Sequence, residues 1–290
     1  MGGIHIMRQR SFLHGKLKPI QKILLYLILY GGVILFAFPL FWMLVTSLKT
    51  MGDIHKVPMI WLPSSIQWSN YKQIFIDAPM GRYLLNSVGY TCISVFGTVL
   101  ASSMAAFAFA RLRARGNMLL FVLVLSTMMI PSQVTLIPQY LLFNQIHWTN
   151  SYLPLIVPAF TGSAFVIFLL RQFYLGISRE MDEAVKIDGG GHLVMYWRIL
   201  LPLSAPALAT SAVLEIMSRW NDLFGPLIYL SESSQYPLSL GLANFTAAYG
   251  QTPWNLLMAA SVVTVFPLLL LFFFAQKVFI QGIVISGSKG

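Results

Sequence analysis

Residues 23–47 read ILLYLILYGGVILFAFPLFWMLVTS, an apolar run without a charged side chain. A helix needs about 20 consecutive apolar residues to cross the hydrocarbon core of a bilayer. The run is too long for the apolar core of a cleavable signal peptide, and no A-x-A cleavage site follows it. We therefore expect a retained first span at Ile23–Ser47. Five basic residues precede this span: Arg8, Arg10, Lys16, Lys18 and Lys22.

The composition of the whole chain also points to a membrane protein. Of its 290 residues, 57% are hydrophobic and 10% are charged, whereas soluble domains carry about 25% charged residues. The net charge is +10, but the basic residues stand at the ends of apolar runs. This distribution argues against nucleic-acid binding, which needs the charge gathered on one solvated face. Cys92 is the only cysteine, so no intrachain disulfide can form.

Five further apolar stretches predict an all-α integral membrane fold with six transmembrane helices. They cover Tyr83–Ala110, Met118–Phe143, Leu153–Leu170, Pro206–Leu230 and Trp254–Phe279. Pro131 and Pro138 interrupt the stretch at 118–143, because each proline removes a backbone donor and bends a helix. Broken helix at membrane depth is tolerated where protein covers it or where it lines a wet cavity. We therefore expect this interruption not to face lipid, and either to be covered by protein or to line a wet cavity.

The lysines and arginines set the expected orientation. With both termini in the cytoplasm, the inside segments hold 14 of them and the outside segments hold 4, in agreement with the positive-inside rule. The loop at 171–204 then lies in the cytoplasm, and the segments 49–82 and 231–253 lie outside. Three parts are expected in all: a cytoplasmic tail at 1–22, a transmembrane domain at 23–280 that includes the cytoplasmic loop, and a cytoplasmic tail at 281–290.

A short amphipathic helix is expected in the loop at 178–191, which reads SREMDEAVKIDGGG. Three carboxylates stand in its first turns, where they meet the positive end of the helix dipole. Asp182 and Lys186 have the i,i+4 spacing of an ion pair. The apolar face of this helix would consist of Met181, Ala184 and Val185.

Three glycines at 189–191 should end this helix and permit a tight reversal of the chain. A second short helix is expected at His192–Leu200, before Pro202. The product is a helix-turn-helix on the cytoplasmic face, and its apolar patch suits a groove on a partner protein. The alternative is an ordinary cytoplasmic loop that happens to be helical.

The spacing within this loop resembles a known signature. Glu183-Ala184-Val185, Gly189 and Ile199-x-Leu201-Pro202 resemble the pattern E-A-A, three residues, G, nine residues, I-x-L-P. That pattern is typical of the permease subunits of binding-protein-dependent ABC importers. The match departs from it at Val185, where the family usually has alanine, and this is a small apolar change.

Other segments resemble the carbohydrate branch of that family, and the chain is similar to its maltose-type permease subunit with six spans. These segments are Asn86-Ser87, Ala105–Arg111, Met129–Pro131 with Ile137-Pro138, Phe168–Phe173, Trp220–Asp222 and Gly282–Gly290. The resemblance implies a type I importer permease fold in a bacterial or archaeal cell membrane. It also implies four kinds of partner: a second permease, two copies of a cytoplasmic ABC ATPase, an extracytoplasmic solute-binding protein, and a sugar or oligosaccharide.

The resemblance assigns the loop to coupling with the ATPase. The residues concerned are Glu183, Ala184, Val185, Asp188, Gly189, Ile199, Leu201 and Pro202. The chain has no G-x-x-x-x-G-K-[ST] phosphate loop, so ATP and its Mg²⁺ are expected on the ATPase and no cofactor on this chain. Its histidines lack metal-ligand spacing, and no pair of nucleophile and base is evident. We therefore expect a transport subunit that is not itself an enzyme.

The predicted fifth span carries a polar stripe. Ser211, Glu215, Arg219 and Asp222 are spaced to share one face of a helix, and Trp220 and Asn221 flank them. Ionisable residues within a membrane usually face the bundle interior or a water-filled path, and aromatic and amide side chains suit a sugar. We interpret these six residues as candidates for the translocation path. The alternative is structural, with Glu215 and Arg219 paired to each other.

Two alternatives to a sugar importer remain open at this stage. A self-sufficient secondary transporter driven by an ion gradient would have a similar number of spans, although such proteins often show internal repeats. An ABC importer permease for another polar solute, such as glycerol phosphate, would suit the cationic Arg219.

The expected orientation can be tested by labelling introduced cysteines in sealed cells. An impermeant thiol reagent should label a cysteine placed at Ser65 and should not label one placed at Ser288, because the charge distribution puts the first outside and the second inside. Labelling at position 288 in sealed cells would contradict this orientation.

Overall fold

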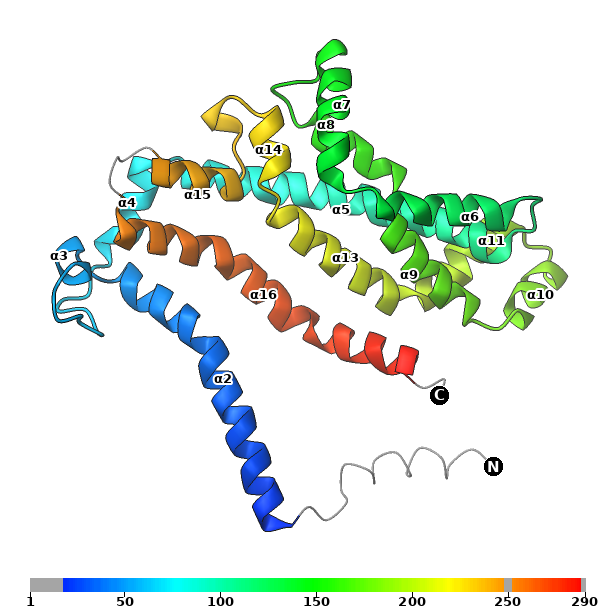
Figure 1. The fold of residues 1–290 in the computed structure, drawn as a ribbon. Coiled ribbons are helices and arrows are strands. Elements are labelled where there is room, and N and C mark those ends of the chain that lie inside the picture. Colours follow the sequence, from blue (N-terminus) through cyan, green and yellow to red (C-terminus); the bar gives the residue numbers. More distant parts are fainter. Residues whose placement is uncertain (1–17, 248–251, 288–290) are drawn as a thin grey trace.

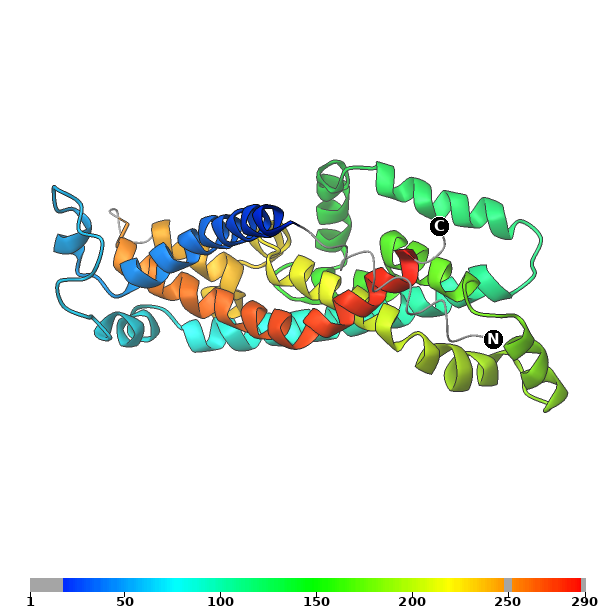
Figure 2. The ribbon, with the colours of Figure 1, turned by 90° about the horizontal axis from the view of Figure 1, so that it is seen from below.

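The computed structural model describes residues 18–247 and 252–287, and every regular element in these ranges is a helix. Long helices run along the length of the molecule, and α13 (Ala205–Trp220) lies between α5 (Met80–Arg111) and α16 (Trp254–Gly287) and contacts both (Figure 1). The view from below shows the same elongated bundle (Figure 2). The parts of the predicted tails at 1–17 and 288–290 lie outside the described residues, as does 248–251.

Four stretches of the described chain are long and apolar enough to cross a membrane. They are Pro19–Ser47, Met80–Arg111, Leu153–Leu175 and Trp254–Gln276. Two bent helix pairs, at 117–145 and 192–220, raise the number to as many as six when each pair counts as one span. Each of the six predicted spans overlaps one of these six segments, and the all-α membrane fold is confirmed.

Helix α2 (Pro19–Ser47) is the most exposed of the long helices. It begins four residues before the predicted first span, and only its C-terminal residues Val45, Thr46 and Ser47 are buried. It contacts α16 at that end and leaves the bundle over the rest of its length (Figure 1). Most of its remaining apolar side chains are exposed, which suits a surface covered by lipid.

Small side chains let other elements approach α5 closely. The ring of Phe160, in the 3-10 helix η2 (Val157–Thr161), lies so near Gly97 that an added Cβ would be 2.7 Å from it. The Ser102 hydroxyl accepts a hydrogen bond of 2.9 Å from the backbone N–H of Ser163, at the start of α9 (Ala164–Leu175). Close approach of this kind through small residues is typical of helix packing in membranes.

The segment between α2 and α5 contains two short helices, α3 (Met51–Ile54) and α4 (Ser69–Asp77). Buried Asn70 ties it to the bundle, because its amide donates to the carbonyls of Ser47 and Lys49 and accepts from Asn255. Burial lowers the pKa of Lys49, whose ammonium group lies over the Trp42 ring. The segment is thus folded against the ends of α2 and α16.

The predicted third span is broken once and not twice. Helix α6 (Asn117–Ser126) and the short η1 (Thr127–Met129) lead to a sharp bend at Pro131, which stands immediately before α7 (Ser132–Gln145). Pro138 lies inside α7, and the helix continues through it. The prediction of a break at Pro138 was therefore wrong. A proline removes one hydrogen bond, and here the flanking turns still keep their helical form.

The predicted fifth span at 206–230 was also wrong as a single helix. Helix α13 (Ala205–Trp220) ends at Trp220, and a separate short helix, α14 (Phe224–Tyr229), follows it. The Asp222 carboxylate accepts a hydrogen bond from the backbone N–H of Gly225, which holds the chain in a turn between the two helices. Side chains of this kind compete with helix continuation by bonding the local backbone.

The close packing on α5 predicts that Gly97→Val destabilises the protein. The added side chain must displace the Phe160 ring, and overpacking of a core costs about 1–3 kcal/mol. We expect a lower melting temperature and less folded protein in the membrane, measured by fluorescence-detected size-exclusion chromatography after heating. The matched control is Gly89→Val on the same helix, where an added Cβ meets no atom within 4 Å. Equal stability of the two variants would contradict this account of the packing.

Candidate functional site

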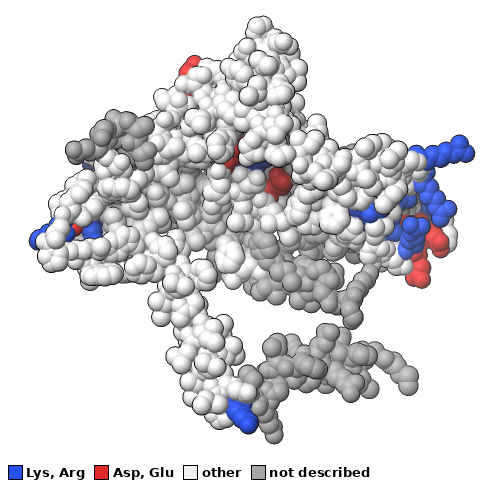
Figure 3. Space-filling view, viewed as in Figure 1, with Lys and Arg blue, Asp and Glu red and all other residues white. Residues whose placement is uncertain are grey.

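Helix α10 (Glu180–Ile187) projects from one end of the bundle, and both ribbon views show it there (Figures 1 and 2). The space-filling view shows Lys and Arg side chains gathered at this end, with acidic side chains beside them (Figure 3). The first turn of α10 holds Glu180, Asp182 and Glu183, as expected from the sequence.

An arginine at the end of α5 fixes the position of α10. The Arg111 guanidinium lies 3.1 Å from an Asp182 carboxylate oxygen, and its side chain is only 2% exposed. It also donates hydrogen bonds of 2.9 Å to the carbonyl of Tyr174, near the end of α9, and to that of Ile177, just beyond it. The predicted pair of Asp182 with Lys186 was wrong, because Asp182 turns toward the bundle. From the sequence, Arg111 was one of the basic residues at the end of a span and part of the segment that resembles the carbohydrate branch, and its contact with Asp182 was not predicted.

The outer surface of α10 is exposed and has no partner within the described chain. Glu183 and Ala184 are exposed, and no hydrogen bond or ion pair within 18–247 and 252–287 reaches the Glu183 carboxylate. Ile187 is 85% exposed and Met181 is 42% exposed. Val185, which the sequence placed on the same apolar face, instead packs inward against the core. The exposed apolar surface of α10 therefore consists of Met181 and Ile187 with Ala184.

Two glycines shape the turn that ends α10. Gly189 has φ +77° and donates its N–H to the carbonyl of Lys186 at 3.0 Å. The N–H of Gly190 donates to the carbonyl of Val185 at 2.7 Å, and an added Cβ at Gly190 would lie 2.6 Å from the Val185 side chain. The expected reversal after the helix is present, with Asp188 exposed at the C-cap.

The chain then returns through a second helical stretch that is longer than predicted. It consists of α11 (His192–Val194), the π-helix η3 (Met195–Leu200) and α12 (Leu201–Leu203), and so extends past Leu200. Ile199 and Leu201 are half-buried and Pro202 is exposed.

This second stretch is held firmly in the bundle. Leu200 is fully buried, and the hydroxyls of Tyr196 and Ser103 on α5 share a hydrogen bond of 2.6 Å. The helix-turn-helix therefore has one arm built into the bundle and one arm, α10, exposed.

The predicted polar stripe divides into buried and exposed members. Ser211 is fully buried and donates to the carbonyl of Ala207 in its own helix. Trp220 is also buried, and its indole N–H donates to the carbonyl of Thr264 on α16 at 3.1 Å. The Nε atom of Arg219 lies 3.8 Å from a carboxylate oxygen of Glu215, so the two form an ion pair, and both side chains are partly exposed. Two of the six candidates thus serve the packing of α13.

Asp222 does not share a helix face with the others, because α13 ends at Trp220. Its carboxylate instead accepts a hydrogen bond of 3.0 Å from the hydroxyl of Tyr90 on α5, and its carbonyl accepts one from Ser239. Asn221 is exposed at the end of α13, and its amide donates to the carbonyl of Met217. Nothing in the sequence indicated the role of Tyr90, since no local pattern connects it with a residue as distant in the chain as Asp222.

The chain is similar to proteins of known family. Residues 97–285 match the model of the family described as binding-protein-dependent transport system inner membrane component. The arabinooligosaccharides transport system permease protein of Halalkalibacterium halodurans is 32% identical over 87% of this chain and 91% of its own length. The trehalose/maltose transport system permease protein of Thermococcus litoralis is 29% identical over 93% and 99%, respectively.

A solved structure shares the fold. It is the crystal structure of a bacterial ABC transporter involved in the import of the acidic polysaccharide alginate. One of its chains aligns with a TM-score of 0.80 and 22% identity, over 89% of this chain and 96% of that chain. The match at 97–285 contains both arms of the helix-turn-helix and the whole of α13. This chain therefore belongs to the family of binding-protein-dependent transport system inner membrane components, the membrane-spanning permeases of ABC importers.

Proposed function

We propose that this chain forms, with a second related permease, the path by which a sugar or oligosaccharide crosses the cell membrane. An extracytoplasmic binding protein delivers the solute, and two copies of a cytoplasmic ABC ATPase drive the transport. ATP and Mg²⁺ bind to the ATPase, and this chain, which has no phosphate loop in its sequence, provides the docking surface. Both termini and α10 lie on the cytoplasmic side in this proposal.

The observation that carries the proposal is the form of α10. An exposed helix with apolar residues and an unpaired carboxylate is suited to a groove on a partner protein. The Arg111–Asp182 pair connects that helix to α5 and α9, which run through the bundle. A movement of the partner around α10 would therefore be transmitted to the spans through a hydrogen-bonded and largely buried joint.

The cargo is proposed from the relatives and from the end of α13. Two relatives named above transport arabinooligosaccharides and trehalose or maltose, and another is the sulfoquinovosyl glycerol permease protein of Agrobacterium fabrum. Asn221 and the partly exposed Glu215 and Arg219 are the members of the polar stripe that remain available to a solute. Their amide and charged groups can hydrogen-bond sugar hydroxyls.

A phosphorylated polyol is the second candidate cargo. The sn-glycerol-3-phosphate transport system permease protein of Brucella abortus is 30% identical over 92% of this chain and 97% of its own length. Arg219 offers the guanidinium that an anionic solute would need. Uptake of labelled maltose, an arabinooligosaccharide and glycerol 3-phosphate by the same reconstituted complex separates the two candidates.

The coupling role predicts a defect for Gly189→Asp. Gly189 occupies the left-handed region, where a residue with a side chain costs about 1–2 kcal/mol. Distortion of the turn should displace α10 and lower solute uptake by about tenfold, the effect of a docking loss near 1.4 kcal/mol. The matched control is Gly191→Asp, where φ is −89° and an added Cβ meets nothing within 4 Å. Uptake and retention of the ATPase in purified complexes are measured together.

Glu183→Ala tests the proposed contact of the carboxylate itself. We expect weaker retention of the ATPase, because a hydrogen bond to a charged group contributes about 1.5–3 kcal/mol. Glu180→Ala removes an exposed carboxylate from the same helix at a position outside the signature, and it should have less effect. Normal uptake by both Glu183→Ala and Gly189→Asp would contradict the coupling role.

The path role predicts different outcomes for two adjacent residues. Asn221→Leu should reduce uptake and leave the assembled complex intact, because the side chain is exposed and bonds only the backbone of its own helix. Asp222→Leu should reduce the amount of assembled complex, because it leaves the Tyr90 hydroxyl and the Gly225 N–H without their acceptor. Loss of a partner for a buried polar group costs about 1–3 kcal/mol. Complex yield and uptake per assembled complex decide between the two effects.

A further inference from the structure

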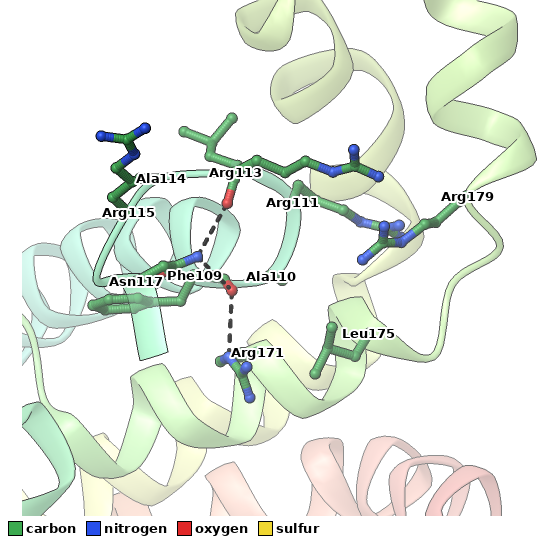
Figure 4. A pocket seen from close by; sticks show the side chains of 11 residues that line it. Phe109, Ala110, Arg111, Arg113, Ala114, Arg115, Asn117, Arg171, Leu175 and Arg179 are labelled. Atoms are coloured by element: carbon green, nitrogen blue, oxygen red, sulfur yellow. Dashed lines mark hydrogen bonds between the residues drawn. The ribbon is translucent and has the colours of Figure 1, made fainter. Parts of the chain in front are cut away.

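A pocket of about 520 Å³ lies where α5 ends, α6 begins and α9 passes beneath them. Figure 4 shows side chains from these elements and from the start of α10 around it. Five of its eleven lining residues are arginines: Arg111, Arg113, Arg115, Arg171 and Arg179. No acidic residue lines it. The pocket is therefore a concentration of positive charge at the ends of apolar helices.

The structure already uses two of these arginines. Arg111 is neutralised by Asp182, as described above. Arg171 is held in place, because its guanidinium lies 4.1 Å from the centre of the Phe121 ring and its Nε–H donates to the carbonyl of Phe109. The stacking and one hydrogen bond fix the Arg171 guanidinium in place. Its other N–H groups remain available as hydrogen-bond donors to a ligand.

The other three arginines have no counterion within the described ranges. Arg113, Arg115 and Arg179 are exposed, and their side chains make no ion pair or hydrogen bond within 18–247 and 252–287. Like charges gathered in one hollow repel each other, so a bound anion would stabilise the arrangement. Guanidinium groups present paired N–H donors that match the oxygens of a phosphate, which makes them suited to phosphate recognition.

The surface next to the pocket is apolar. Helix α6 starts at its rim with Asn117, whose amide caps the carbonyls of Leu112 and Phe109. The following side chains Met118 and Leu119 are 65% and 64% exposed. An acyl chain could lie along this helix while its headgroup occupies the pocket, whereas a free anion would make no use of the apolar flank. Basic pockets between transmembrane helices bind the headgroups of anionic lipids in this way.

We propose that this pocket is a phosphate-binding site and that its ligand is the headgroup of an anionic phospholipid. The headgroup phosphate binds among the guanidinium groups that line the pocket, and the acyl chains lie against α6. The site is separate from the outer surface of α10 and from Asn221 at the end of α13. A lipid there would fix the turn between α5 and α6 next to the Arg111–Asp182 joint.

The test uses the complex purified in detergent, with phosphatidylglycerol, cardiolipin or phosphatidylcholine added back and bound lipid counted by native mass spectrometry. Arg113→Gln/Arg115→Gln removes two charges without breaking any described contact. We expect its retention of phosphatidylglycerol and cardiolipin to fall about 10- to 30-fold, since each basic residue near the ligand contributes about fivefold. The matched control is Arg82→Gln/Arg198→Gln, which removes two exposed arginines outside the pocket. It should retain lipid like the unmodified chain.

The remaining arms identify the source of the phosphate and exclude a protein ligand. Adding Arg171→Gln should weaken the binding of anionic lipid further. All variants should retain phosphatidylcholine to the same extent. Inorganic phosphate and phospholipid are also compared for protection of the complex against heat. The lipid assignment is overturned if inorganic phosphate protects the unmodified complex but not Arg113→Gln/Arg115→Gln, while phospholipid protects neither. Equal anionic lipid retention by the pocket and control variants would overturn the site. Loss of the ATPase with unchanged lipid retention would show a protein contact instead.

Discussion

The Arg111 guanidinium connects the membrane bundle to its exposed helix. It is almost completely shielded from solvent, and it binds one carboxylate of α10 and two carbonyls from the end of α9 and beyond. An uncompensated charge in such a place would cost several kcal/mol, about 3–5 when one partner of a buried pair is removed. The charge is tolerated because three acceptors surround it. That requirement fixes α10 relative to α5 and α9, and so it determines which residues of α10 face outward.

The position of Arg111 depends in turn on how closely other elements pack on α5. Gly97 leaves room for the Phe160 ring, and Ser102 and Ser103 hydrogen-bond to the start of α9 and to Tyr196. These small side chains let the helices approach closely. Close packing of this kind is the usual basis of helix association in a membrane, where lipid removes the hydrophobic drive between helices. The same helix thereby supports the exposed arm at one end and the Tyr90–Asp222 contact nearer its other end.

The end of α13 shows how one short sequence can divide between structure and function. Trp220 and Asp222 are directed into the protein, where they bind α16 and α5, while Asn221 between them is exposed. The helix stops there because the Asp222 carboxylate bonds the backbone of Gly225. Residues adjacent in sequence therefore differ in role as soon as the helical repeat is broken.

The apolar runs and the spacing of Glu183, Gly189 and Pro202 were enough to predict the membrane fold and the family. These features are local: the length of a hydrophobic run, the position of a glycine and the residue types in a loop are visible without neighbours. The partner of Asp182, the inward turn of Val185 and the acceptor of the Tyr90 hydroxyl were not visible, and the predicted pairs and faces were wrong there. Each depends on a contact between segments distant in the chain.

A straight helix through 206–230 was expected because hydropathy continues across Asn221 and Asp222, yet hydropathy does not report where a side chain bonds the backbone. The sequence by itself determined that these segments enter a membrane and that the loop is helical. Only the tertiary structure decided which polar groups meet, because a buried polar group selects its partner by distance and geometry in the folded protein.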